Sequence, residues 1–137
     1  MARDRFHGAV RRALEKGGWL ITADPYIVRF DRTAVEIDLA AEQLLAAEWS
    51  GQKIVVEVKS FLHPSPIHDL KSALGQYVLY SRFLELTAPE RKVYLAVSDE
   101  VYSSVFEQKA IQAVVEGLPL SLIAVNVVAE EIVSWIN

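Results

Sequence analysis

The sequence contains no cysteine, which excludes disulfide bonds and thiolate metal sites. It has no apolar run as long as a membrane span and no signal peptide, so we expect a cytoplasmic protein that makes no membrane contact. A glycine-rich phosphate loop and a nucleophile elbow are both absent. The three histidines do not share a zinc spacing: His7 could contact a phosphate or lie at the surface, and His63 is assigned no role.

What is present fits one domain over residues 1–137, a length sufficient to bury a real core. The hydrophobic content of 52% is slightly high for such a small domain. Two explanations fit this value, a buried interface in a homo-oligomer or simply a generous core.

Charge is distributed unevenly along the chain. The net charge of −4 argues against a simple nucleic-acid coat. Residues 1–32, however, carry seven of the fourteen Lys and Arg residues and only four of the eighteen acids. A basic N-terminal surface beside an acidic centre suits a metal-dependent nuclease, and an ordinary solvated first helix is the alternative.

Hydrophobic periodicity and turn residues predict alternating helices and strands. Helices are expected at 4–16, 66–86 and 99–116, and strands at 19–22, 35–41, 53–60, 91–97 and 120–128. Three segments are less defined: 26–30 is a strand or an extended loop, 42–49 is more extended than helical, and 130–137 is undecided. The first three strands should form an antiparallel meander, and the strand after the long helix should join by a crossover. The expected fold is therefore a mixed α/β sheet with helices on its faces.

The long helix at 66–86 has a predicted N-cap at Ser65 and a proline in its first turn. Its main packing stripe is predicted to be Ile67, Leu70, Leu74, Tyr77, Val78, Ser81 and Leu84. A second apolar face, with Ala73, Tyr80 and Phe83, lies nearly opposite. One face could then cover the sheet and the other a partner subunit, which favours a homo-oligomer.

Two of the strands carry acids in otherwise apolar surroundings. Asp38 lies in strand 35–41, where Val35, Ile37 and Leu39 are expected to share the opposite face. Glu57 and Lys59 project from one face of strand 53–60, roughly 6–7 Å apart. A charge there is costly unless it is paired or metal-bound. An exposed polar sheet face is the plainer explanation of the same pattern.

The order of elements and the Asp38, Glu57 and Lys59 set resemble the PD-(D/E)xK nuclease superfamily, whose restriction-endonuclease-like core is αβββαβ. Within it, the chain resembles the XisH family, the fdxN-element excision controlling factors of cyanobacteria. That resemblance rests on Arg5-Phe6-His7, Ala13-Leu14-Glu15-Lys16-x-Gly18-Trp19, Glu36-Ile37-Asp38-Leu39, Val56-Glu57-Val58-Lys59-Ser60-Phe61, Pro64-Ser65-Pro66-Ile67, Ala73-Leu74-Gly75-Gln76-Tyr77 and Val93-Tyr94-Leu95-Ala96-Val97.

Two converging carboxylates, Asp38 and Glu57, would suit Mg²⁺ or Mn²⁺, and Lys59 would orient the attacking water or stabilise charge on the phosphate. The resemblance implies two additions to this site. Glu15 would complete the metal ligands from the first helix, although an Arg11–Glu15 surface pair is equally compatible. Gln76 would act with the catalytic set as part of a QxxxY element, in which Tyr80 has no assigned role.

One departure from the literal motif is the absence of a proline before Asp38, a position that supplies no ligand. The function expected is that of a divalent-metal-dependent DNA endonuclease acting in excision of a genomic element. The alternative is a non-catalytic accessory factor that keeps the fold and regulates a site-specific recombinase. The resemblance also implies an XisI-type protein and that recombinase as partners.

Overall fold

The structure, a computed structural model, describes the backbone of residues 2–43 and 51–137 and the side chains from Arg5 onward. Six strands form one mixed sheet in the order β1-β4-β5-β6-β7-β8. Their bounds are β1 Leu20–Ala23, β4 Leu39–Gln43, β5 Gln52–Val58, β6 Arg91–Ser98, β7 Leu122–Asn126 and β8 Glu131–Ile136. Strand β6 pairs in parallel with both β5 and β7, and the other neighbouring strands of the sheet pair antiparallel. This is the mixed sheet expected from the sequence.

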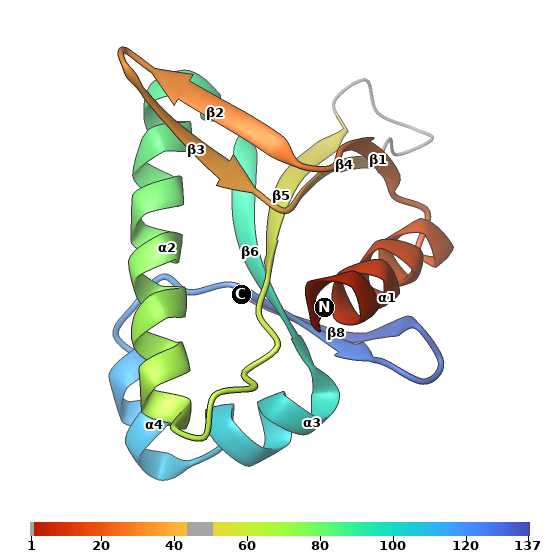
Figure 1. Ribbon diagram of the computed structural model, residues 1–137, viewed down its shortest axis with the longest axis vertical. Helices are drawn as coiled ribbons and strands as arrows, with labels where there is room; N and C mark the ends of the chain where they lie inside the picture. The colour runs from red at the N-terminus through yellow and green to blue at the C-terminus, as the bar shows by residue number, and fades with distance from the viewer. Residues whose placement is uncertain (1, 44–50) are drawn as a thin grey trace.

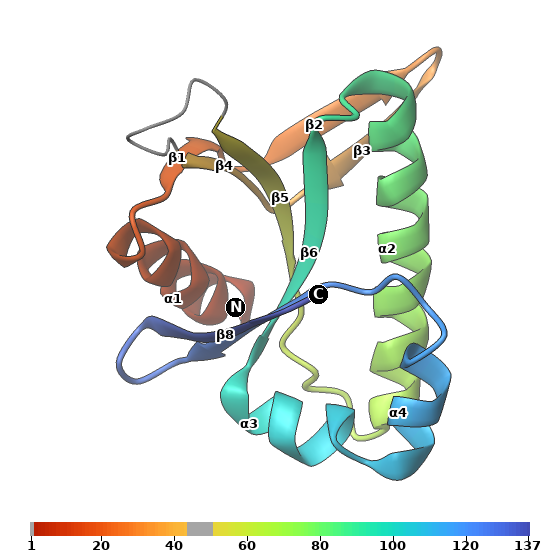
Figure 2. The same cartoon turned by 180° about the vertical axis from the view of Figure 1, so that it is seen from behind.

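Helices cover both faces of the sheet. Helix α1 (Ala2–Lys16) lies on one face and helix α2 (Pro66–Thr87) on the other, as Figures 1 and 2 show from opposite sides. Taken in chain order, α1, β1, β4, β5, α2 and β6 make the αβββαβ core. A hairpin of β2 (Tyr26–Phe30) and β3 (Thr33–Ile37) is inserted between β1 and β4 and forms a separate two-stranded sheet. The segment 26–30 is thus a strand, but not one of the main sheet.

Local sequence explains where the two main helices begin and end. Helix α1 stops at a glycine pair, and Gly18 adopts a φ of 89°, which glycine accepts without steric cost. Helix α2 starts as predicted: the Ser65 hydroxyl accepts a hydrogen bond from the His68 N–H at 3.3 Å, and Pro66 occupies the first turn.

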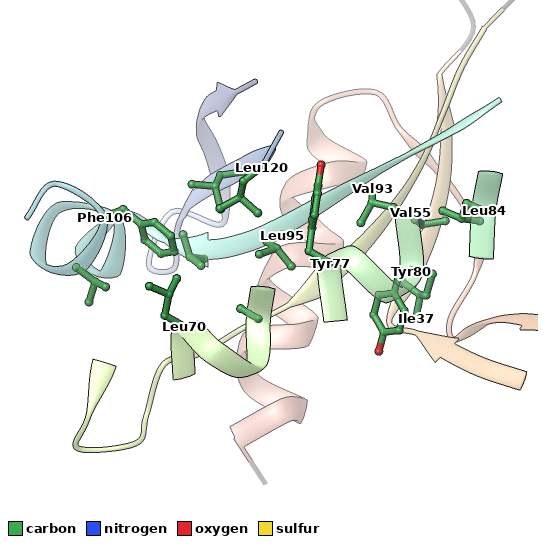
Figure 3. Close-up of a cluster of buried hydrophobic side chains, with 14 of the residues drawn as sticks. Ile37, Val55, Leu70, Tyr77, Tyr80, Leu84, Val93, Leu95, Phe106 and Leu120 are labelled. Carbon is green, nitrogen blue, oxygen red and sulfur yellow. The ribbon is translucent and has the colours of Figure 1, made fainter. Parts of the chain in front are cut away.

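Each face of the sheet has its own hydrophobic core. Under α1 the core joins Phe6, Val10 and Leu14 to the strand residues Leu39 and Val56. The core under α2 is shown in Figure 3, where Tyr77, Tyr80 and Leu84 face strand residues that include Val55, Val93 and Leu95. Because both faces are covered, any polar side chain on the central strands is buried unless it lies at a strand end.

The predicted strand 35–41 is wrong in one informative respect. It is two strands that meet at Asp38, with Ile37 in the core under α2 and Leu39 in the core under α1. The expectation that Ile37 and Leu39 share a face therefore fails. The physical reason is a change of pairing, since β3 pairs with β2 whereas β4 pairs with β1 and β5.

The packing face of α2 also differs from the prediction. The buried residues are Leu70, Ala73, Tyr77, Tyr80 and Leu84, spaced three and four apart. Ile67 and Val78, which were placed in the stripe, are 49% and 65% exposed. The predicted second face is wrong for Ala73 and Tyr80, because both are part of the core beneath the helix.

The C-terminal third shows three further differences. The helix expected over 99–116 is interrupted: α3 (Asp99–Val101) continues into a π-helical turn (Tyr102–Phe106), and α4 (Lys109–Val115) follows. Of α4, Ile111 is buried whereas Ala113 and Val114 are exposed. The predicted strand 120–128 is shorter, and the undecided tail is β8.

Within the expected extended segment 42–49, Glu42 and Gln43 belong to β4, and 44–50 lie outside the described residues. No helix of the described ranges is long and apolar enough to cross a membrane.

Candidate active site

Asp38, Glu57 and Lys59 lie together at one end of the main sheet. The Asp38 N–H donates to Glu57 Oε1 at 3.3 Å, and the Val58 N–H donates to Asp38 Oδ2 at 2.8 Å. The Lys59 ammonium is 3.9 Å from Glu57 Oε2. The structure therefore brings together the three residues expected to converge, although their catalytic and metal-binding roles stay predictions.

Strand pairing produces this convergence. In the antiparallel β4–β5 ladder Leu39 is opposite Val56, so Asp38, one residue before β4, comes beside Glu57. Strand alternation sends Glu57 and Lys59 toward the α2 face, whereas Val56 packs under α1. The Lys59 N–H donates to the Ala96 carbonyl at 2.9 Å, which fixes the end of β5 against β6.

Glu57 is one of two buried polar residues in the described chain, with 6% of its surface exposed. Burial, followed by the neighbouring charge of Asp38, raises the pKa of its carboxyl to about 8, against the opposite effect of Lys59. With both carboxyls ionised, the site would hold more negative charge than Lys59 offsets. A bound cation, or a proton on Glu57, would relieve this repulsion.

Gln76 and Tyr80 on α2 adjoin this site. The Gln76 side-chain amide contacts the Tyr80 hydroxyl at 3.4 Å, and Gln76 Oε1 is buried with no hydrogen-bond partner among the described residues. Burial, followed by the charges of Glu57 and Asp38, raises the pKa of Tyr80 to about 12. Tyr80 was assigned no role from the sequence, and only the QxxxY spacing signalled its place.

Glu15 is not brought to the same place. Its side chain is 48% exposed and lies 4.0 Å from Arg11, in the surface pair that was the alternative for this residue. Helix α1 packs on the face of the sheet opposite to the one from which Glu57 and Lys59 project. Because Glu15 pairs with Arg11 on the α1 side of the sheet, its role as a metal ligand stays a prediction without structural support.

The histidines have contacts of their own. His7 Nε2 lies 2.8 Å from Asp24 Oδ1, while Arg11 donates to Asp24 Oδ2 at 2.7 Å, which fastens α1 to the turn after β1. Sequence reasoning missed Asp24 as the shared partner, although His7 and Arg11 are one helical turn apart. His63 stacks on His68 with ring centroids 4.1 Å apart, near the start of α2.

The ligands that the site offers fit one kind of metal. Among the described residues no cluster of three or more His, Cys, Asp or Glu side chains could hold an ion. Asp38 and Glu57 supply two carboxylates, and magnesium is commonly held by one or two carboxylates with water and substrate phosphate completing its octahedron. The residues present therefore fit Mg²⁺ or Mn²⁺, and they do not fit zinc, which takes a fuller set of nitrogen or sulfur ligands.

The fold and the acid–acid–lysine cluster define the class: an α/β protein with a restriction-endonuclease-like αβββαβ core and a mixed central sheet. The sequence matches the model of the XisH protein family over residues 1–133. The chain belongs to the XisH family, as the sequence blocks suggested.

Two solved structures agree with this assignment. An XisH family protein from Nostoc punctiforme PCC 73102 is 37% identical, with a TM-score of 0.89. An fdxN element excision controlling factor protein from Anabaena variabilis is also 37% identical, with a TM-score of 0.87. In both cases the similarity covers 98% of this chain and 100% of the other. A comparison with curated proteins gave no match.

Proposed function

We propose that this protein is a divalent-metal-dependent endonuclease that acts on DNA during excision or rearrangement of a genomic element. The element-excision role is suggested by the similar protein from Anabaena variabilis, described as an fdxN element excision controlling factor. The catalytic role is carried by one observation: a buried glutamate, Glu57, shares a strand end with Asp38 and Lys59.

Asp38 and Glu57 would hold Mg²⁺ or Mn²⁺, which would supply Lewis acidity toward a phosphate oxygen and lower the pKa of bound water. The chain's own residues do the rest. Lys59, whose side chain is only 19% exposed, is held beside Glu57 and would donate to the attacking water or to the developing charge on phosphorus. Gln76 and Tyr80 support the same site from α2, where the buried Gln76 carbonyl oxygen is available to accept a further hydrogen bond.

A second candidate function is a non-catalytic accessory factor that controls a site-specific recombinase, together with an XisI-type partner. The raised pKa of Glu57 favours it, because a carboxyl with a pKa of about 8 keeps its proton at neutral pH when no metal is bound. The net charge of −4 favours it as well, since it gives no general attraction to DNA.

A cleavage assay separates the two. Supercoiled, linear single-stranded and branched DNA would be incubated with the protein in Mg²⁺ or Mn²⁺ or EDTA. We expect metal-dependent nicking that falls by about 100-fold in Lys59→Met, the usual cost of losing one transition-state donor. Lys53→Met is the matched control, because Lys53 lies on the same strand but at its other end, 3.9 Å from Glu42. Equal loss in both variants, or no nicking of any substrate by the wild type, would support the accessory factor.

A further inference from the structure

An open cleft of about 720 Å³ lies between α1 and the segment that follows β5. Its wall carries two arginines, Arg5 and Arg12, and two serines, Ser60 and Ser98. Leu62, 70% exposed, stands in the same wall and Glu130 completes it from the loop between β7 and β8. Cationic, hydroxyl and apolar groups are thus mixed on one concave surface.

The cleft lies on the α1 side of the sheet, at the same end of the sheet as the candidate active site, which faces α2. Ser60 directly follows Lys59, so the two Cα atoms are about 3.8 Å apart. Ser98 ends β6, the strand whose Ala96 carbonyl fixes the Lys59 backbone. A chain of linked phosphates that placed one phosphate at the Asp38–Glu57–Lys59 site would have to pass around this end of the sheet to enter the cleft.

The lining groups suit a nucleic-acid backbone. Arginine forks bind phosphate oxygens, and serine hydroxyls are common phosphate donors. The Ser98 hydroxyl accepts from the Val101 N–H at 3.1 Å, and because a hydroxyl both accepts and donates, its O–H can still donate to a phosphate oxygen. Leu62 can lie against a sugar or a base edge.

We propose that this cleft binds the sugar–phosphate backbone of DNA beside the phosphate to be cleaved. The proposal rests on the proposed function, because it assigns the cleft to the same substrate. It adds that the DNA backbone would be held by Arg5, Arg12, Ser60 and Ser98. Neither the acid–acid–lysine motif nor the family assignment gives these residues that role.

Glu130 occupies the Arg12 guanidinium that a DNA phosphate would bind. Arg12 Nε donates to Glu130 Oε2 at 2.7 Å, and the two side chains are 54% and 25% exposed. The position of Glu130 is set independently of this pair, since Lys16 Nζ donates to the adjacent Ala129 carbonyl at 2.7 Å. The carboxylate therefore competes with a phosphate for the Arg12 guanidinium. Removing its charge frees Arg12 for DNA.

The test is DNA binding measured by fluorescence anisotropy with a labelled duplex in EDTA, over a range of salt concentrations. Glu130→Gln should tighten binding and make the slope of log K against log salt steeper by about one phosphate contact. Arg5→Gln, and the double variant Arg12→Gln/Glu130→Gln, should weaken binding by about 10-fold and make the slope shallower by a similar amount. The control is Arg82→Gln/Glu85→Gln, which neutralises a 2.8 Å arginine–glutamate pair on the exposed side of α2 and should change nothing.

Unchanged affinity and slope in all cleft variants would overturn the proposal, as expected if the cleft instead receives a protein partner. So would the absence of DNA binding by the wild type. Neither result bears on the metal site. That site is tested independently by the effect of Lys59→Met on cleavage and by metal binding in the absence of DNA. Binding by the wild type with loss in the cleft variants supports the proposal even if no DNA is cut.

Discussion

The buried carboxyl of Glu57 makes stability depend on pH in a way that can be calculated. In the unfolded chain this carboxyl has an ordinary pKa near 4.5, and in the folded protein the pKa is about 8. The folded state therefore binds more protons between these values. The contribution of Glu57 to the free energy of unfolding is therefore most favourable below pH 4.5 and falls as pH rises toward 8. At pH 7 the cost of keeping Glu57 protonated is about 3 kcal/mol, from 1.4 kcal/mol per pKa unit.

Glu57→Gln removes this cost, because glutamine has the shape of a protonated glutamate and nothing to ionise. The metal-free variant should exceed the wild type in free energy of unfolding by about 3 kcal/mol at pH 7, and by little at pH 4.5. Coupling to Asp38 spreads the titration over both carboxyls and reduces the difference. Urea unfolding in EDTA, followed by fluorescence of the buried Trp19, measures it at each pH.

The matched control is Glu85→Gln, since Glu85 is 62% exposed and pairs with Arg82 at the surface of α2. It should change the free energy of unfolding by less than about 1 kcal/mol at either pH. The reasoning is refuted if Glu57→Gln is less stable than the wild type at pH 7, or if the difference between them is the same at both pH values.

At pH 8, Mg²⁺ or Mn²⁺ should raise the melting temperature of the wild type but not of Asp38→Ala, whose metal-free form should be at least as stable as the wild type; an equal rise in both would place the ion elsewhere. We also expect a homo-oligomer, most simply a two-fold dimer, formed through the side of α2 that exposes Val78 (65%) and Leu79 (48%). In sedimentation, Val78→Glu should then be a 15.3 kDa monomer, whereas the control Val114→Glu, on α4, should still be an oligomer. A monomeric wild type would contradict the predicted homo-oligomer.

Local sequence patterns were enough to predict the two main helices and the crossover, and the resemblance to the nuclease superfamily led us to expect Asp38 beside Glu57 and Lys59. Strand alternation places Glu57 and Lys59 on one face whatever the rest of the fold does. The cap at Ser65 and the glycines after α1 act within a few residues, so the helix boundaries are also local properties.

The errors arise where distant pairing decides. The change of face between Ile37 and Leu39 depends on β3 leaving the main sheet, which no periodicity within 35–41 reveals. The buried side of α2 is decided by the strands beneath it, so Tyr80 rather than Val78 enters the core. The position of Glu15 also depends on tertiary structure, because it is set by the face of the sheet that α1 covers, and its role as a metal ligand stays a prediction.

The central claim, that Asp38 and Glu57 form a divalent metal site, is tested most directly by calorimetric titration of Mn²⁺ into the DNA-free protein at pH 7. The account predicts saturable binding with proton release, detected by repeating the titration in buffers of different ionisation enthalpy, because Glu57 must lose its proton to act as a ligand. Asp38→Asn should weaken binding by more than about 10-fold. Binding of equal strength in Asp38→Asn, or binding without proton release, would contradict it.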